Sequence, residues 1–228
     1  GEGSETLGDD GKTYVNLSED GTANCYLVQK AGDYKFKAVQ GNTDGTVGNV
    51  KSVEVLWESF GTTTAPNVGD IIASTSYHDG YIRFSTPETF AEGNAVIAAK
   101  NAKGVILWSW HIWCASEGWK KQVYYNNAGT MMDRNLGATS AKPGDVGSLG
   151  LFYQWGRKDP FLGAGSVSGE SRAASTGSWT ISSDSMTPVI AEQNPMTFYM
   201  YSFNYLPDWC WDSNKTAYDP CPAGWRVP

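Results

Sequence analysis

The stretch Val105–Trp113, with the sequence VILWSWHIW, constrains the fold more than any other part of the chain. Three tryptophans and His111 fall on it, and apolar residues occupy both of its alternating faces. A strand with one face in solvent alternates apolar and polar residues, whereas a strand that is apolar on both faces is covered on both. We therefore expect Val105–Trp113 to be a central strand with protein packed on either side.

Short segments with a two-residue apolar period surround this strand, as half-buried strands should. The pair Asp79-Gly80 inside Tyr77–Phe84 predicts a hairpin with a type I′ turn, because both residue types tolerate positive φ. Strands at such regular spacing are typical of an antiparallel β-sandwich of about 100 residues. The other segments expected to form strands are Thr13–Leu17, Asn24–Gln29, Tyr34–Val39, Val53–Trp57 and Ala95–Lys100.

The length of 228 residues exceeds that of a typical single domain. Ten Trp, twelve Tyr and eight Phe, together with 26 Gly, favour strands and loops over helices. The composition changes near Ser116-Glu117-Gly118, where we place a boundary. We predict a mainly β protein with a flexible polar leader over residues 1–11, a β-sandwich domain over residues 12–116 and a second domain over residues 117–228.

The formal net charge of −7 argues against a nucleic-acid partner, because phosphates are bound by clustered Lys and Arg. No apolar run approaches the roughly 18 residues that span a bilayer. Attachment to a membrane would therefore need a lipid anchor outside these residues.

Motifs for catalysis are missing from the sequence, which has no GxSxG elbow, HExxH pair, P-loop or EF-hand loop. Of the two histidines, we expect His78 to be an exposed turn residue and His111 a packed strand residue. We predict no catalytic residue, no metal site and no cofactor. A glycosidase pair of carboxylates meets in space, and the sequence singles out no such pair.

Four cysteines, Cys25, Cys114, Cys210 and Cys221, allow three fully paired connectivities. None lies in a CxxC pair, and with two histidines in the chain a zinc site is not expected. Cys210 and Cys221 are close enough in sequence to close a small loop, so we keep them as a candidate disulfide. The apolar run around Cys25 predicts a buried, inert thiol.

The segment Trp209–Asn214 has the side chains of a sugar-binding site, since sugar rings stack on aromatic rings while amides and carboxylates bond to hydroxyls. We take Trp209, Trp211, Asp212 and Asn214 as candidate ligand-binding residues. The alternative is that this segment is a hydrophobic anchor beneath a long loop.

Two charged segments, Asp133–Asn135 and Gly156–Asp159, place Arg close to a carboxylate. We expect both to tie loops together through hydrogen bonds between Arg and a carboxylate.

Three motifs of the second half occur together in one known family. They are Met131–Ala138 (MMDRNLGA), Gly150–Arg157 (GLFYQWGR) and Asp219–Pro228 (DPCPAGWRVP). In order and spacing they resemble the Fibrobacter succinogenes major paralogous domain, over about Tyr124 to Pro228. The resemblance implies an incomplete C-type-lectin-like α+β domain. In that family a helix and further strands follow the last motif, including a late cysteine that would pair with Cys221.

The first half, with Asn24–Val28 and Gly93–Ala98, looks like the β-sandwiches that precede this domain in fimbrillin-like surface lipoproteins of Bacteroidetes. The resemblance implies a non-catalytic, extracellular adhesion or recognition protein, associated with fimbriae at the outer-membrane surface. Its expected partner is a glycan or a host or matrix protein, and other fimbrial subunits are further candidates.

Two alternatives remain open. One is a carbohydrate-binding accessory protein of a glycan-uptake system. The other is an enzyme related to the formylglycine-generating fold, which would need a copper-binding cysteine pair that the resemblance does not supply. The sequence does not identify the ligand.

Overall fold

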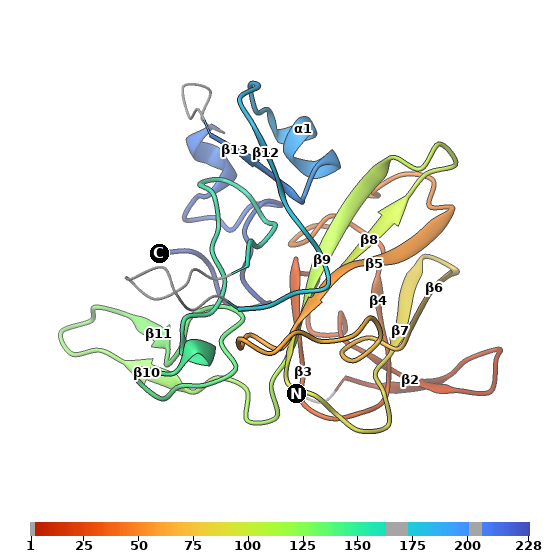
Figure 1. The fold of residues 1–228 in the computed structure, drawn as a ribbon, viewed down its shortest axis with the longest axis horizontal. Helices are drawn as coiled ribbons and strands as arrows, with labels where there is room; N and C mark the ends of the chain where they lie inside the picture. The colour runs from red at the N-terminus through yellow and green to blue at the C-terminus, as the bar shows by residue number, and fades with distance from the viewer. Residues whose placement is uncertain (1–2, 163–172, 201–206) are drawn as a thin grey trace.

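The computed structural model describes residues 3–162, 173–200 and 207–228 (Figure 1). Over these residues the fold is mainly β and contains one short α-helix. Its elements are β1 (Glu5–Leu7), β2 (Thr13–Asn16), β3 (Cys25–Val28), β4 (Asp33–Lys37), β5 (Ser52–Ser59), β6 (Ser74–His78), β7 (Tyr81–Ser85), β8 (Gly93–Lys100), β9 (Ile106–Cys114), β10 (Lys121–Val123), β11 (Thr130–Met132), η1 (Val146–Ser148), β12 (Thr180–Ser182), α1 (Pro188–Gln193), β13 (Thr197–Tyr199) and η3 (Asp208–Cys210).

Two sheets make up the first half of the chain. One has five strands in the order β1-β2-β4-β7-β6, and the other has four strands in the order β3-β9-β8-β5. The apolar stretch identified in the sequence forms β9, which pairs with β3 on one side and β8 on the other. Residues 108–114 of this strand are all buried.

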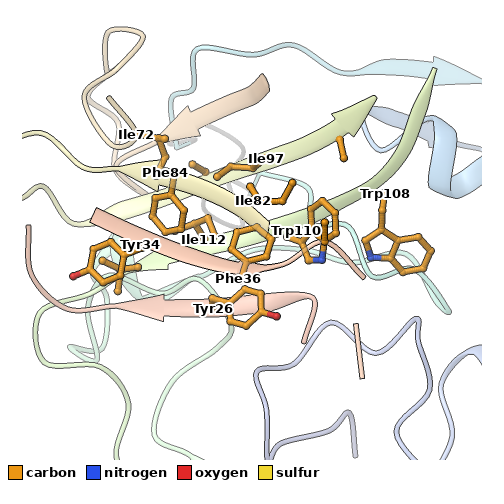
Figure 2. Packing of buried hydrophobic residues seen from close by; sticks show 14 of the residues in the cluster. Tyr26, Tyr34, Phe36, Ile72, Ile82, Phe84, Ile97, Trp108, Trp110 and Ile112 are labelled. Carbon is orange, nitrogen blue, oxygen red and sulfur yellow. The ribbon is translucent and has the colours of Figure 1, made fainter. Parts of the chain in front are cut away.

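The two sheets face each other across one hydrophobic core (Figure 2). Phe36 and Phe84 enter it from the five-stranded sheet, while Ile97 and Trp110 enter it from the four-stranded sheet. The rings of Phe36 and Trp110 meet with centroids 5.2 Å apart. Each such side chain stabilises the fold by about 1.5–3 kcal/mol when it leaves water, so the shared core holds the sheets together.

The second half of the chain covers the other face of the four-stranded sheet. Trp113 of β9 packs there with Trp119 and Met132, and Trp57 of β5 packs with Leu151. The prediction that the central strand is covered on both sides is therefore confirmed.

Two strand pairings differ from the antiparallel sandwich that we expected. β2 pairs with β4 in parallel, and β3 pairs with β9 in parallel, so both sheets are mixed. The cause is the path of the chain. After β2 it crosses to the other sheet to form β3 and then returns to the first sheet as β4, and a crossover of this kind allows two strands of one sheet to pair in parallel.

The expected leader is also partly wrong, because residues 5–7 form β1 and pair with β2. Asp9 and Asp10 anchor the following turn, with Asp9 accepting from Arg83 at 2.7 Å and Asp10 from Tyr14 at 2.5 Å. Every residue of β1 is exposed, and its backbone hydrogen bonds to β2 are its main attachment. Such an edge strand has no apolar alternation by which the sequence could reveal it.

The hairpin predicted around Asp79-Gly80 is confirmed. β6 and β7 pair up to His78 and Tyr81, which leaves a two-residue turn. Asp79 has φ 48° and Gly80 has φ 80°, the two positive values that a type I′ turn requires.

Regular structure is sparse in the second half. β10 and β11 form an antiparallel hairpin that projects from the body of the molecule, and β12 pairs with β13 in parallel beside α1 (Figure 1). No helix in the described part of the chain is long and apolar enough to cross a membrane.

Of the two ties predicted between Arg and a carboxylate, one is present. Arg134 holds Asp133 through two hydrogen bonds of 2.9 and 3.0 Å. Arg157 instead donates to backbone carbonyls, among them that of Thr197 at 2.7 Å. The buried ion pair of this segment joins Lys158 to Asp159 at 2.7 Å.

Candidate functional site

A groove of about 840 Å³ opens between the β10–β11 hairpin and the C-terminal segment. We call it the aromatic groove. Residues 128–136 form one wall, residues 220–228 contribute the other, and Tyr153 and Trp211 complete the lining. Apolar surface exceeds polar surface in it, which is the usual character of a ligand site.

A buried carboxylate shapes the C-terminal wall. Asp219 is fully buried and accepts from the backbone N–H of Cys221 at 2.8 Å and of Val227 at 2.9 Å. The ammonium of Lys215 donates to the carbonyls of Cys221, Pro222 and Trp225. These bonds close residues 219–227 into a fixed loop that presents Trp225 and Arg226 to the groove.

A row of indoles joins this wall to the central strand. The ring of Trp225 meets that of Trp119 edge to face at 6.3 Å, and Trp119 stacks on Trp113 of β9 at 5.4 Å. Trp113 is fully buried and donates its indole N–H to the carbonyl of Ala138. The position of Trp225 is thus set by side-chain contacts that begin in the core.

Two titratable groups in the lining stay neutral at physiological pH. Burial raises the pKa of the Tyr153 hydroxyl well above its usual value, and burial also raises the pKa of the Cys221 thiol. Among the described residues the Tyr153 hydroxyl has no hydrogen-bond partner. A buried hydroxyl is costly when it is unpaired, so an enclosed water is the partner expected for it, and this hydroxyl is not exposed to a ligand in the groove.

Charged side chains in the lining are three: Asp133, Arg134 and Arg226. The hydrogen bonds from Arg134 lower the pKa of Asp133, which also accepts from the backbone N–H of Lys120 at 3.0 Å. Asp133 is therefore ionised and occupied by its partners. Arg226 is exposed and donates to the carbonyl of Val227 at 2.8 Å.

One of the four candidate ligand residues lies in the groove. Trp211 lines it, packs against Trp155 with centroids 5.0 Å apart and donates its indole N–H to the carbonyl of Tyr218. Trp209 is 53% exposed and contacts Tyr218, but it is not part of the lining.

Asp212 and Asn214 are exposed and also lie outside the lining. The hydroxyl of Ser213 is the main cause of a lowered pKa at Asp212, to which the positive charge of Arg226 also contributes. Asp212 is thus close enough to Arg226, which lines the groove, for the positive charge of that arginine to contribute to its lowered pKa.

The candidate disulfide between Cys210 and Cys221 is absent, and all four cysteines are free and buried. Cys210 belongs to a small core with Met186, Ala191 and Tyr199, whereas Cys221 lines the groove, so different packing environments separate them. The predicted burial of Cys25 is confirmed, and burial raises its pKa well above the usual value.

The histidines are placed as expected. His78 is exposed at the end of β6, and His111 is buried in β9. His111 Nε2 lies 2.8 Å from Asn94 Oδ1, and burial lowers its pKa to about 3. Across residues 3–162, 173–200 and 207–228, no three His, Cys, Asp or Glu side chains gather in a group that could hold a metal ion.

Several residues of the groove were not identified from the sequence, namely Tyr153, Trp225, Arg226 and the Asp133–Arg134 pair as part of a site. Trp225 and Arg226 stood out only as a family motif, and Tyr153 only as one aromatic among many. They become a site because the fold brings residues near 130, 153, 211 and 225 to one place. Comparisons with family models, curated proteins and solved structures found no match to this chain.

Proposed function

We propose that this chain is a non-catalytic recognition module of a cell-surface adhesion protein, and that it binds carbohydrate in the aromatic groove. The observation that carries this proposal is the groove itself. Trp211 and Trp225 offer ring faces or edges, and the exposed Arg226 offers hydrogen-bond donors beside them. Sugar ligands need this combination of apolar stacking and directed polar contacts.

The proposal extends to architecture and location, where it relies on the family resemblance. We propose a β-sandwich over the first half and a C-type-lectin-like domain over the second, on an extracellular lipoprotein of the outer-membrane surface. The facing sheets of the first half and the braced loop at residues 219–227 support this assignment. The natural partner would then be a glycan of a host cell or matrix.

A carbohydrate-binding accessory of a glycan-uptake system is the second candidate. It is favoured by the aromatic surface beside the groove, where Trp155 is 50% exposed and packs on Trp211. The two candidates share the binding site and differ in the source of the glycan. Binding to host glycans supports adhesion, whereas binding to dietary or storage polysaccharides supports uptake.

The test is binding to a glycan array and to immobilised matrix proteins, followed by calorimetry with the best glycan. The variant Trp211→Ala should weaken binding on the order of tenfold, because it removes a stacking ring from the lining. The matched control is Trp209→Ala, which removes an indole that is about half exposed and outside the groove. Circular dichroism would verify that both variants keep the fold.

Equal loss in the two variants would contradict the assignment of the groove. No binding on either array, together with turnover of a small substrate, would overturn the proposal as a whole.

A further inference from the structure

We propose that the aromatic groove selects an anionic saccharide, with the negative group of the sugar paired to Arg226. This inference rests on the proposed function and deepens it by naming the class of ligand. It starts from a contrast in charge. The chain carries a formal net charge of −7, whereas two of the three charged side chains that line the groove are arginines.

The first arginine is already neutralised. Arg134 binds both carboxylate oxygens of Asp133, from Nε to Oδ1 at 2.9 Å and from Nη2 to Oδ2 at 3.0 Å. This two-point pairing uses the geometry that makes Arg–carboxylate bonds strong. Asp133 and Arg134 therefore contribute little net charge to a ligand, and the charge of the groove is that of Arg226.

Arg226 is the free cation of the lining. Within the described residues it forms no salt bridge, and it donates a hydrogen bond from Nη1 to the carbonyl of Val227. Asp212 is near enough to feel its charge, but the hydroxyl of Ser213 is the larger influence on that carboxylate. The guanidinium thus retains donors for an incoming anion.

The backbone beneath Arg226 is held in place. The N–H of Val227 is bound by Asp219 at 2.9 Å, and the carbonyl of Trp225 accepts from Lys215. An arginine on a fixed backbone loses less freedom on binding than one on a loose tail, which favours a planar, two-point contact with a carboxylate or sulfate.

The tryptophan rings near Arg226 favour a charged saccharide over a free inorganic anion as the ligand. Trp225 precedes Arg226 and is braced by Trp119, and Trp211 lies in the same lining. A charged sugar can stack its apolar face on an indole while its acidic group meets the guanidinium. The remaining negative charge of the chain does not forbid this, because charges beyond about 8 Å are screened at physiological ionic strength.

The experiment compares charged and neutral saccharides of the same size by calorimetry. One pair is trigalacturonic acid and its methyl ester, and another is sialyllactose and lactose, with sulfated lactose to distinguish a sulfate from a carboxylate. We expect the wild-type chain to bind at least one anionic member on the order of five- to tenfold more tightly than its neutral counterpart. The preference should shrink in 0.5 M salt, where the screening length is only a few ångströms.

Three variants test whether the preference for anionic saccharides depends on Arg226. Arg226→Gln should abolish it, and Arg226→Lys should retain part of it, because the charge remains but the planar fork is lost. Lys103→Gln is the control, since it removes one positive charge from an exposed turn between β8 and β9. It should leave the preference unchanged.

Equal affinity for the charged and neutral members, failure to bind any anionic member, or an undiminished preference in Arg226→Gln would each overturn the inference. Neutral glycans that bind in a Trp211-dependent manner would still support the proposed function in that case. Failure of neutral glycans as well, on the array and in calorimetry, would overturn both.

Discussion

His111 is a titratable residue inside the central strand, where the fold keeps it neutral. Its Nε2 bonds to Asn94 Oδ1, and Asn94 in turn donates to the carbonyl of Gly137 at 2.8 Å. Because the Asn94 amide nitrogen is used as a donor, its oxygen accepts, so Nε2 carries the proton of the imidazole. Nδ1 has no partner among the described residues, and protonation there would place an uncompensated charge in the core.

This arrangement predicts how stability depends on pH. Burial lowers the pKa of His111 from an ordinary 6.5 to about 3, so between these values the unfolded chain binds the extra proton. Stability should therefore fall as pH decreases through this window, by up to about 1.4 kcal/mol per pH unit from this residue. Urea unfolding at several pH values between 7.5 and 5 would measure the slope. His111→Gln should flatten it, and an unchanged slope in that variant would contradict the prediction.

The buried charges at Lys158 and Asp159 show what residue patterns can and cannot predict. Ser109 of β9 donates to Asp159 at 2.5 Å and accepts from Lys158 at 2.8 Å, so the ion pair is fastened to the central strand. The sequence predicted a structural role for these charges. The expected hydrogen bond to a carboxylate was assigned to Arg157. The actual partner of Lys158 and Asp159 is Ser109, which lies about 50 residues earlier in the chain, so the local sequence does not indicate it.

Turn chemistry was the most predictable feature among the elements, and strand direction was the least. Asp79-Gly80 fixes its hairpin through two residues that accept positive φ, a purely local preference. The parallel pairing of β3 with β9 joins Cys25 to His111, residues that are remote in sequence. Periodicity shows that a strand is half-buried or buried, but it does not show which strand lies beside it or in which direction.

At the start of β8, backbone geometry admits only glycine. Gly93 has φ +156°, and a Cβ built there would lie 2.3 Å from the carbonyl oxygen of Ser59 and 2.8 Å from Ile71. Gly93→Ala should therefore destabilise the protein by about 3 kcal/mol, through strain and overpacking together. Gly104 is the matched control, because its φ is +76° and nothing lies within 4 Å of its Cβ position.

Gly104→Ala should cost only the left-handed backbone penalty, about 1–2 kcal/mol. Thermal and urea unfolding of the two variants would give the difference. Similar losses in both would show that contact with Ser59 is relieved by small shifts of the strand.

At the scale of the whole molecule, two asparagines join the first half to the C-terminal segment: Asn42 donates to the carbonyl of Thr216 at 2.7 Å, and Asn24 makes the more buried link. Asn24 donates to the carbonyls of Ala217 at 2.7 Å and Asp219 at 2.8 Å, and its oxygen accepts from the indole of Trp108 at 2.9 Å. Its side chain is buried, so these three bonds have no competition from water. The loop that carries Trp225 and Arg226 is thus fixed to the core of the other half.

Removal of the Asn24 side chain should increase the local mobility of the C-terminal wall of the groove more than that of the two sheets. Asn24→Ala should lower the free energy of unfolding by about 1–3 kcal/mol, because three partners lose a buried hydrogen bond. Hydrogen exchange should rise most at the backbone of residues 217–227. Asn101→Ala, in the turn before β9, is the control and should leave exchange in that segment unchanged. Equal protection of the segment in wild type and Asn24→Ala would contradict this role.

The groove also explains why a site of this kind is hard to predict. Trp209–Asn214 was predicted to bind sugar because its aromatic and polar residues are consecutive in the sequence. Of its four candidate residues, only Trp211 lines the groove. The rest of the lining comes from residues 128–136, from Tyr153 and from the C-terminal segment, which are up to about 100 residues apart in the sequence. Mainly β structure and the buried central strand follow from periodicity, whereas the groove depends on how loops pack against that strand.

The row of indoles from Trp113 through Trp119 to Trp225 has an optical consequence. Neighbouring tryptophans exchange excitation energy readily over spacings of 5.4 and 6.3 Å. Light absorbed by the innermost ring can therefore be emitted by the outermost one, at the edge of the groove. Contact at Trp225 is in this way coupled to the intrinsic fluorescence of the core, and the molecule contains its own unlabelled reporter of occupancy.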